Sequence, residues 1–487
     1  MIKIENLTFS YPGSYDNIFE HVSFQIDSSW KLGLIGRNGR GKTTLLNLLR
    51  GKYEYSGTIT GPMQFDYFPY PVSDQTRLTT EILQEVCPSA EEWQFMREFS
   101  FLDIDADILW RPFSTLSNGE QTKVLLAALF LNEGRFLLID EPTNHLDAAA
   151  RQKVAAYLRK KKSFILVSHD RHFLDGCVDH ILSLNRTSIE VQSGTFSSWM
   201  ENFEQKQASE QAQSERLKKD IKRLSLSAKR AAAWSDRTEA SKIGAADKGY
   251  VGHKAAKMMK RSKAAESRKQ QAIAQKSALL KNTEYAGTLK IHPLSYHAEL
   301  LASFSDVSVY YGSTCVCPPV SLEIRRGERV VIDGANGSGK SSLLKLLLGR
   351  SIDHTGTVKV GSGLRISYVP QDTSHLCGRL TEYAAARSLD ESLFKAILRK
   401  MDFERIQFEK NMEDFSGGQK KKVLLAGSLC EQAHLYIWDE PLNFIDIYSR
   451  MQIEQLIAEF QPTMLFVEHD GAFREAAATR IVTLKRT

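Results

Sequence analysis

The sequence lacks any hydrophobic run long enough to cross a membrane, and it contains little cysteine. Its longest fully apolar stretch, Val124–Leu131, has eight residues, whereas a membrane-spanning helix needs about 20. The N-terminal "MIKIENLTFSY" alternates like a strand and has no apolar block typical of a signal peptide. Of the six cysteines, only Cys315 and Cys317 are close, at the wrong spacing for a zinc or redox motif. We therefore expect a cytoplasmic protein with reduced cysteines.

Positive charge is small in total and very unevenly placed. The chain carries a formal net charge of +6. Residues 201–290 hold 21 Lys and Arg against 10 Asp and Glu, a net of +11, so the rest of the chain has a net of −5. This asymmetry indicates a polyanionic partner for the central segment.

The chain contains an internal repeat. The stretch "GLIGRNGRGKTTLLNLL" at 33–49 is echoed by "VIDGANGSGKSSLLKLL" at 331–347. The distance from Lys42 to Asp140 is 98 residues, and that from Lys340 to Asp439 is 99. We therefore predict three parts: residues 1–198 as a first domain with a helical arm insertion at about 72–116, a basic linker at 199–290, and a second copy of the domain at 291–487.

Within each copy, alternating strands are followed by a strand, a glycine loop, a helix and later apolar strands such as "RFLLID" and "LYIWD". Strands that alternate with helices predict an α/β fold with a largely parallel core sheet.

The linker sequence predicts two long helices. Its two flanking segments lack Gly and Pro, whereas the stretch "SDRTEASKIGAADKGYVG" between them is rich in glycine. We predict an antiparallel helical hairpin with a tip at about 235–253, each helix about 50 Å long at 1.5 Å per residue. A solvated coiled-coil spacer is the alternative. The candidate RNA-contacting tip residues are Lys242, Ile243, Lys248, Tyr250, Val251, His253 and Lys254; the apolar ones would wedge against bases or pack onto the hairpin itself.

Both glycine loops fit G-x-x-x-x-G-K-[ST], the phosphate-binding loop. Glycines let backbone N–H groups surround the phosphates at a helix N-terminus. Lys42 and Lys340 would reach the β- and γ-phosphates, while Thr43 and Ser341 would offer a hydroxyl to Mg²⁺. The predicted phosphate-loop residues are Gly36, Asn38, Gly39, Gly41, Lys42, Thr43 and Thr44, and then Gly334, Asn336, Gly337, Gly339, Lys340, Ser341 and Ser342.

An Asp-Glu pair ends one apolar strand in each copy. Asp140 and Asp439 would hold Mg²⁺, and Glu141 and Glu440 would polarise the attacking water. Taken alone, such a pair is more often a capped loop. A histidine also occurs at matching positions of the two copies. His169 and His469 would sense the γ-phosphate.

The stretches "LSNGEQTKV" and "FSGGQKKKV" make the chain resemble the ATP-binding-cassette ATPases along both copies. In that family two cassettes pack head to tail, so the resemblance implies that each signature closes the ATP site of the other copy. The signature residues are Ser117, Asn118, Gly119 and Glu120, and Ser416, Gly417, Gly418 and Gln419. The resemblance also implies that Tyr11 and Tyr311 stack on adenine and that Gln371 contacts Mg²⁺.

Two departures from the family pattern stand out. Asn118 replaces a signature glycine; asparagine tolerates φ > 0, but its side chain crowds the phosphate. Tyr70 stands where the second copy has Gln371. We expect both sites to bind ATP and at least one to hydrolyse it slowly.

Two cassettes joined by a basic hairpin resemble the ABC-F class, whose members act on the ribosome. "DEPTNHLD", "YIWDEPLNFID", "LWRPFSTLS" and "MKRSK" are most similar to the antibiotic-resistance branch, Lsa-like proteins associated with lincosamides, streptogramin A and pleuromutilins. The resemblance implies a monomer without a transmembrane partner that is cytoplasmic and ribosome-associated. Its ATP-bound form would enter the exit site, displace the peptidyl-site tRNA and approach 23S rRNA, and hydrolysis would release it. A translation factor without a resistance role, a transporter ATPase and a nucleic-acid repair or chromosome ATPase are the alternatives.

Overall fold

A computed structural model describes most of the chain. The described residues are 1–12, 17–144, 146–185, 189–209 and 288–484, with the isolated positions 216, 219 and 267. The chain divides into two compact units, Met1–Ser197 with Ala286–Thr487, and Ser198–Tyr285. The predicted tip at about 235–253, all its candidate contacts from Lys242 to Lys254, and the return segment apart from position 267 lie outside the described residues, so the hairpin stays a prediction.

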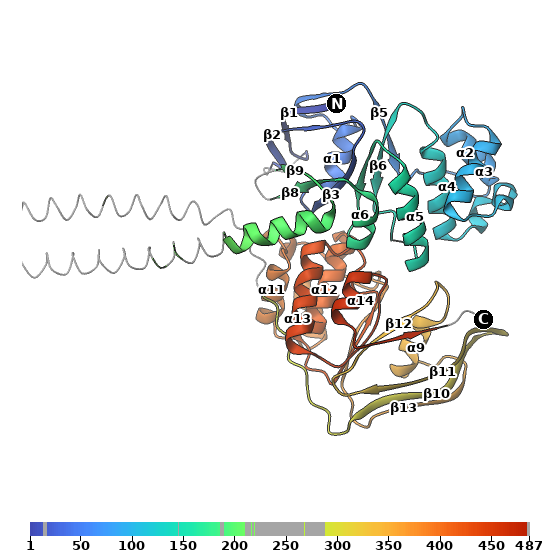
Figure 1. Ribbon diagram of the computed structural model, residues 1–487. Coiled ribbons are helices and arrows are strands. Elements are labelled where there is room, and N and C mark those ends of the chain that lie inside the picture. Colours follow the sequence, from blue (N-terminus) through green and yellow to red (C-terminus); the bar gives the residue numbers. More distant parts are fainter. Residues whose placement is uncertain are drawn as a thin grey trace, which may run out of the picture. The chain divides into compact units, whose positions relative to one another are not determined.

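The first copy contains two sheets (Figure 1). A three-stranded antiparallel sheet has the order β2-β1-β4, and a six-stranded sheet has the order β5-β6-β7-β3-β8-β9, parallel except for β9. These strands are β1 (Ile2–Phe9), β2 (Phe19–Ile26), β3 (Lys31–Gly36), β4 (Ser56–Thr60), β5 (Gln64–Phe68), β6 (Arg135–Asp140), β7 (Phe164–Val167), β8 (His180–Leu184) and β9 (Ile189–Ser193).

The second copy repeats this arrangement. Its antiparallel sheet has the order β11-β10-β13, and its parallel sheet has the order β14-β15-β16-β12-β17. These strands are β10 (Leu300–Tyr311), β11 (Thr314–Arg325), β12 (Arg329–Asp333), β13 (His354–Val360), β14 (Ile366–Val369), β15 (Leu435–Asp439), β16 (Met464–Val467) and β17 (Arg480–Thr483). The predicted α/β class with a parallel core sheet is confirmed in both copies.

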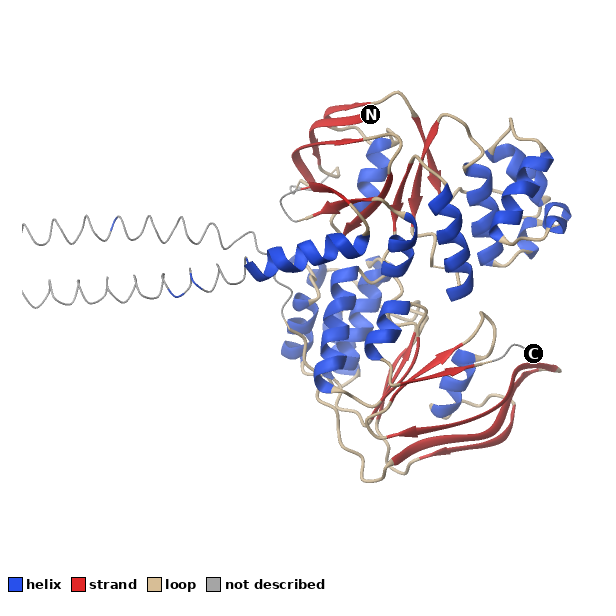
Figure 2. Ribbon diagram, in the orientation of Figure 1, coloured by secondary structure: helices blue, strands red, loops and turns tan. Residues whose placement is uncertain are grey.

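The helices are also repeated (Figure 2). In the first copy they are α1 (Lys42–Leu49), α2 (Thr79–Val86), α3 (Glu92–Leu102), α4 (Asn118–Leu129), α5 (Ala148–Lys160) and α6 (Arg171–Cys177), with short 3-10 turns η1 (Ala106–Trp110) and η2 (Phe113–Thr115). In the second they are α9 (Lys340–Leu347), α10 (Leu380–Ala386), α11 (Glu391–Lys400), α12 (Gly417–Cys430), α13 (Ile447–Phe460) and α14 (Gly471–Ala477), with η3 (Arg405–Glu409) and η4 (Met412–Asp414).

The expectation of an arm insertion at 72–116 needs correction. That segment contains α2, α3, η1 and η2, and the second copy has the matching series α10, α11, η3 and η4. The segment is therefore the helical layer of the repeated unit and not an insertion into one copy.

The central strands form because they are apolar on both faces. Four consecutive residues of β6 and all five of β15 are buried, as expected for a parallel sheet covered on both sides. By contrast, the exposed and buried residues of β1 largely alternate, which suits a sheet with one face in water. These buried strands end at polar residues, and the candidate sites lie at those ends.

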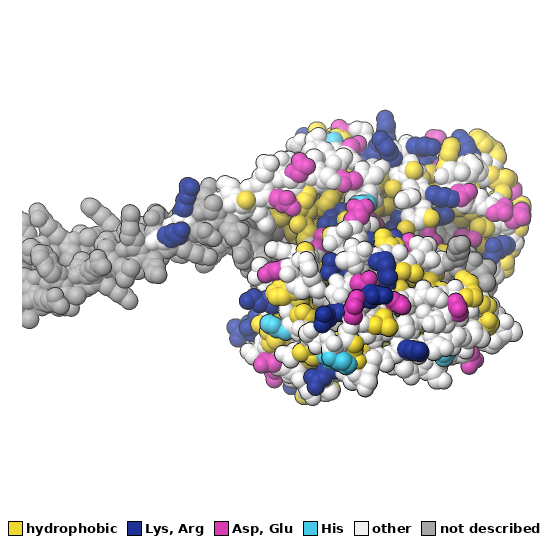
Figure 3. All heavy atoms as spheres, turned by 60° about the horizontal axis from the view of Figure 1, so that its bottom comes forward, with side chains coloured by type: hydrophobic (Ala, Val, Ile, Leu, Met, Phe, Trp, Pro, Cys, Tyr) yellow, Lys and Arg dark blue, Asp and Glu magenta, His cyan; other side chains and the backbone are white. Residues whose placement is uncertain are grey.

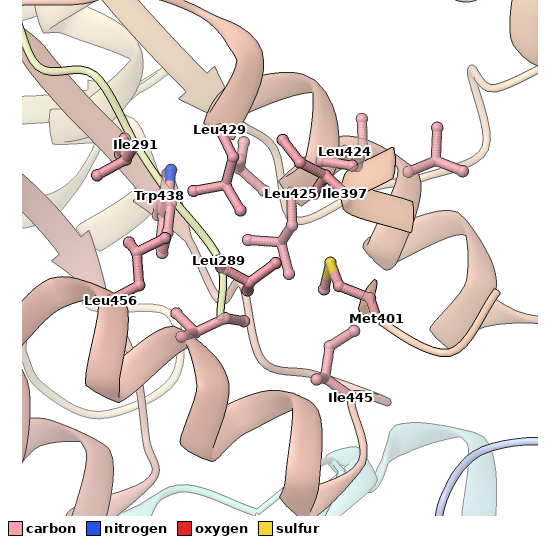
Figure 4. Close-up of a cluster of buried hydrophobic side chains, with 14 of the residues drawn as sticks. Leu289, Ile291, Ile397, Met401, Leu424, Leu425, Leu429, Trp438, Ile445 and Leu456 are labelled. Atoms are coloured by element: carbon pink, nitrogen blue, oxygen red, sulfur yellow. The ribbon is translucent and has the colours of Figure 1, made fainter. Parts of the chain in front are cut away.

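The last residues of the predicted linker, Thr288 and Leu289, belong instead to the second copy and are built into it. Leu289 and Ile291 are 3% and 0% exposed and belong to the cluster around Trp438. Figure 4 shows Leu289 and Ile291 on their extended segment, next to the side chain of Trp438 of β15. The Lys400 Nζ also donates a hydrogen bond of 2.7 Å to the carbonyl of Thr288. The chain is thus firmly anchored where it re-enters the second copy.

Acidic and basic side chains are interspersed over the face shown in Figure 3. This mixed surface fits the small net charge outside residues 201–290. Among the described residues, no helix combines the length and the apolar character needed to span a bilayer.

Candidate active sites

In each copy the predicted phosphate loop, Asp-Glu pair and histidine follow neighbouring parallel strands. The first loop follows β3, Asp140 ends β6, and His169 comes after β7; these strands lie in the order β6-β7-β3. The second copy has the equivalent order β15-β16-β12. Because parallel strands end at the same edge of a sheet, the loops and acidic residues converge there.

The first phosphate loop has the backbone of an anion cradle. Gly39 and Gly41 have φ of 86° and 87°, left-handed values that favour glycine. A Cβ on Gly41 would also lie 2.6 Å from Ile18 Cγ2. Helix α1 begins directly after Gly41 without a side-chain cap, so its first N–H groups remain available to a phosphate.

The loop lysine is buried and holds its own loop. Lys42 Nζ donates to the carbonyl oxygens of Gly36 (2.8 Å) and Arg37 (3.2 Å). Burial lowers the pKa of Lys42, while the nearby carboxylates of Asp446 and Glu141 oppose that shift. The Lys42 ammonium is thus held by neutral carbonyl oxygens and not by a direct ion pair, so it can bind a polyphosphate.

The second phosphate loop is built in the same way. Gly337 and Gly339 have φ of 81° and 85°. Lys340 Nζ donates to the carbonyls of Gly334 (2.7 Å) and Ala335 (2.9 Å). Burial lowers the pKa of Lys340, as it does that of Lys42.

A hydroxyl lies beside a carboxylate in both copies. Thr43 Oγ1 donates to Asp140 Oδ2 at 2.9 Å, and Ser341 Oγ donates to Asp439 Oδ1 at 3.2 Å. Burial raises the pKa of both aspartates. Oxygen ligands of this kind suit Mg²⁺, which prefers one or two carboxylates together with substrate phosphates; the residues present therefore fit that ion.

The predicted adenine-stacking tyrosines are partly engaged within their own copies. Tyr11 OH lies 2.9 Å from Thr44 Oγ1, and Tyr311 OH lies 3.0 Å from Ser342 Oγ. Both tyrosines are exposed beside the phosphate loops, and the Tyr11 ring packs edge-to-face with Phe9 and Tyr53.

The two glutamates have similar backbones but different surroundings. Glu141 and Glu440 have φ of 51° and 46°, strained values for residues with a side chain. Burial and the adjacent Asp140 raise the pKa of Glu141 to about 8. Burial alone would also raise the pKa of Glu440, but the His469 ring and hydrogen bonds from Gln371 and Asn443 outweigh it and lower the pKa.

The histidines lie at these glutamates. His169 Nε2 is 3.2 Å from Glu141 Oε1, and His469 Nε2 is 3.7 Å from Glu440 Oε1. Burial and the charge of Lys42 lower the pKa of His169 well below its usual value. Asn443, which the motif reading did not single out, donates a hydrogen bond of 2.6 Å to Glu440.

Both signatures begin a helix with a capping box. Ser117 and Ser416 are the N-caps of α4 and α12, and Glu120 and Gln419 complete the boxes. Asn118 is the first residue of α4 and does not have a positive φ, so its tolerance of φ > 0 is not used here. Its side chain is exposed at the N-terminus of the helix.

The second signature lies at the first phosphate loop, within the same compact unit. Asn38 Nδ2 donates to the Phe444 carbonyl at 2.7 Å, and a Cβ on Gly418 would lie 2.6 Å from Asn38 Nδ2. Arg40 of the loop also forms an ion pair of 3.3 Å with Asp402. The structure thus brings together the loop of one copy and the signature of the other.

The second phosphate loop and the first signature are joined less closely. Among the described residues, no hydrogen bond or ion pair links the second phosphate loop to Ser117, Asn118, Gly119 or Glu120. The cross-copy influence at Lys340 is the charge of Asp147, which opposes the lowering of its pKa. The two candidate sites are therefore unequal.

Sequence motifs missed the contacts that join the copies away from the loops. Arg171 of α6 pairs with Glu454 of α13, and His172 lies beside Gly471 of α14. No local pattern predicts such pairs, because they depend on how two separate domains pack.

Comparisons with known proteins agree with this repeated architecture. A family model described as ABC transporter matches residues 19–144 and 317–443. The ribosome protection protein VmlR of Bacillus subtilis is 28% identical over 98% of this chain and 85% of its own length. The energy-dependent translational throttle protein EttA of Haemophilus influenzae is 24% identical, over 96% of this chain and 89% of its own.

Solved structures show the same fold. The archaeal ribosome recycling factor aABCE1, in its complex with the ribosomal stalk protein aP1, superposes with a TM-score of 0.66 at 18% identity, covering 99% of this chain and 88% of that one. A structure described as RNase-L Inhibitor gives a TM-score of 0.64 with the same coverage.

Proposed function

The chain belongs to the ABC transporter family of ATP-binding domains, which it contains twice, and we propose that it is an ABC-F ATPase that protects the ribosome from antibiotics. The ATP-binding domains imply ATPase activity. Its relatives include a ribosome protection protein and a translational throttle protein, which supports the ABC-F class.

The observation that carries the proposal is the contact between the first phosphate loop and the second signature. Asn38 and Gly418 meet at the place where an ATP γ-phosphate would lie beside Lys42. A phosphate held there contacts both copies, so nucleotide binding favours the closed pair and hydrolysis loosens it. ATP thereby becomes a switch for whatever the linker contacts.

Each residue type at the sites has a role in ATP hydrolysis to ADP and phosphate. Lys42 and Lys340 hold the phosphates, and Tyr11 and Tyr311 stack on adenine. Mg²⁺, when bound, neutralises phosphate charge; Thr43 with Asp140, and Ser341 with Asp439 and Gln371, would hold it. Glu141 and Glu440 orient the attacking water, and the adjacent His169 and His469 hold those glutamates in place.

The partner is the ribosome, and the drug spectrum follows the Lsa-like branch. The net charge of +11 in residues 201–290 suits phosphate contacts to 23S rRNA and the peptidyl-site tRNA. The ATP-bound protein enters the exit site, its tip approaches the peptidyl-transferase centre, and a lincosamide, streptogramin A or pleuromutilin is expelled. Hydrolysis releases the protein, which acts as a cytoplasmic monomer.

A translation factor without a resistance role is the second candidate. The likeness to a translational throttle protein over nearly the full length of both chains favours it. In that case the same ATP-dependent closure would regulate or rescue stalled ribosomes.

Two measurements test these functions. The double variant Glu141→Gln, Glu440→Gln, saturated with ATP, should co-sediment with 70S ribosomes, whereas the same protein without nucleotide should not. Expression of the wild type in a susceptible bacterium should raise the inhibitory concentrations of lincomycin, tiamulin and virginiamycin M, and Lys42→Ala, Lys340→Ala should abolish the effect. Ribosome binding without any increase in inhibitory concentration would favour the translation factor over the resistance protein. Absence of ribosome binding would overturn both proposed functions.

A further inference from the structure

The two sites differ at one buried position close to the hydrolytic glutamate. The fifth residue after the signature serine is Thr122 in the first copy and Lys421 in the second. Lys421 lies in α12 and is 1% exposed. Burying an ammonium group costs free energy of folding unless its hydrogen-bond donors are satisfied.

Three backbone carbonyls surround the Lys421 ammonium. Its Nζ donates to the carbonyl oxygens of Pro370 (2.7 Å), Gln371 (3.2 Å) and Asp439 (3.3 Å). A lysine ammonium has three donors, so all of them are used. The carbonyls belong to two separate segments, the loop after β14 and the end of β15, and Lys421 ties these segments together.

The loop after β14, to which Lys421 is bonded, in turn contacts Glu440. Gln371 Nε2 donates to Glu440 Oε2 at 2.7 Å, and Asn443 Nδ2 donates to the same oxygen at 2.6 Å. We propose that Lys421 is a positioning residue for ATP hydrolysis at the second site: it fixes the backbone of Gln371 so that the Gln371 side chain holds Glu440 toward the attacking water.

The first copy has no such arrangement. Thr122 is too short to cross the same space, and a cavity of about 300 Å³ remains there, lined by Thr122, Tyr70, Glu141 and Asn144 among others. Tyr70 OH donates to Glu85 instead of Glu141, and Glu141 has the ring of His169 3.2 Å from its Oε1 but, among the described residues, no side-chain amide like that of Gln371 to hold it. The second site is therefore the better organised one for hydrolysis.

This inference rests on the ATPase activity in the proposed function and not on ribosome binding. It is tested on purified full-length protein without ribosomes, in single-site backgrounds. In Glu141→Gln, where the second site alone hydrolyses, Lys421→Met keeps the side-chain length and removes the donors. We expect kcat to fall at least tenfold while KM for ATP changes less than twofold. In Glu440→Gln, where the first site alone hydrolyses, Lys421→Met should lower kcat much less than it does in Glu141→Gln.

A double-mutant cycle separates positioning from a general structural role. Gln371→Ala in the Glu141→Gln background should cost at least as much as Lys421→Met, because it also removes a group that would hold Mg²⁺, and adding Lys421→Met to Gln371→Ala should lower kcat little further, because Lys421 acts through Gln371. Lys421→Arg should retain more activity than Lys421→Met.

Several outcomes would overturn the inference: additive losses, equal losses in both backgrounds, a change in KM alone, or an inactive Glu141→Gln parent beside an active wild type. A wild-type protein without ATPase activity would instead refute the proposed activity itself. A failure to bind ribosomes would not affect the inference about Lys421.

Discussion

The side-chain amide of Asn38 donates a hydrogen bond of 2.7 Å to the backbone carbonyl of Phe444, which lies 406 positions further along the chain. Gly418 packs directly against this bond: a Cβ there would lie 2.5 Å from the Phe444 carbonyl oxygen and 2.6 Å from Asn38 Nδ2. Real Cβ atoms do not approach backbone so closely. The contact between the two copies at the first site therefore requires glycine at this position.

Gly418→Ala should impair the first site selectively. In the Glu440→Gln background, where the first site alone hydrolyses, we expect kcat/KM for ATP to fall at least tenfold because the methyl group forces Phe444 and Asn38 apart. Gly417→Ala is the matched control, since its added Cβ would lie 3.4 Å from Phe444 Cδ2, an ordinary contact, and it should cost less than threefold. Similar losses for the two variants would contradict the proposed contact.

Asp446→Asn should destabilise the protein much more than the equivalent change in the first copy. Asp446 forms an ion pair of 2.9 Å with Lys422, and the two side chains are 0% and 3% exposed. Asparagine keeps the N-cap to α13 but leaves a buried ammonium without its counter-ion, which costs about 3–5 kcal/mol.

Asp147→Asn is the control for that prediction. Asp147 also caps its helix, by accepting from the Ala150 N–H at 2.9 Å, and it is only half-buried. We expect a loss below about 1 kcal/mol. Thermal unfolding followed by circular dichroism should therefore show a clearly lower midpoint for Asp446→Asn, and equal midpoints for the two variants would show that the buried ion pair contributes little.

Much of each copy was predictable because its signals are local. The glycine loop, the apolar strand that ends in Asp140-Glu141 and the capping box at Ser117 all depend on residues close together in sequence. The unequal sites were not predictable, because the ion pair Arg171–Glu454 and the carbonyl cage of Lys421 depend on segments that meet only after folding. Aligned positions show that Gln121 and Thr122 are replaced by Lys420 and Lys421 in the second copy, but only the folded structure shows which of the two lysines is buried.

Glu98 should make the stability of the first copy sensitive to acid. Its carboxylate is 2% exposed and accepts hydrogen bonds from Lys161 (2.5 Å), Tyr157 (2.6 Å) and Arg97 (3.3 Å). Burial alone would raise the pKa of Glu98, but Lys161 and Tyr157 outweigh it and hold the pKa below its ordinary value of 4.5.

Because that pKa is lower in the folded state, the unfolded chain binds the proton more readily. The stabilisation by Glu98 is complete above pH 4.5 and is lost as the pH falls below it. Urea unfolding between pH 7 and pH 3.5 should show a smaller decline in the midpoint for Glu98→Gln than for the wild type. At pH 7 the variant should be less stable by about 3 kcal/mol, because Lys161 loses its buried counter-ion. Parallel declines for both proteins would exclude Glu98 as a source of acid sensitivity.

The proposed RNA contact of the linker predicts a specific dependence on salt. Each lysine that neutralises a phosphate contributes about 0.7–0.9 to the slope of log K against log salt concentration. Replacing Lys242, Lys248 and Lys254 by glutamine should therefore reduce the slope for binding of the Glu141→Gln, Glu440→Gln protein to 70S ribosomes by about 2. The matched control replaces the exposed cassette residues Lys3, Lys162 and Lys359, which removes the same charge. If both triple variants reduce the slope equally, binding responds to net charge alone and the linker is not the contacting element.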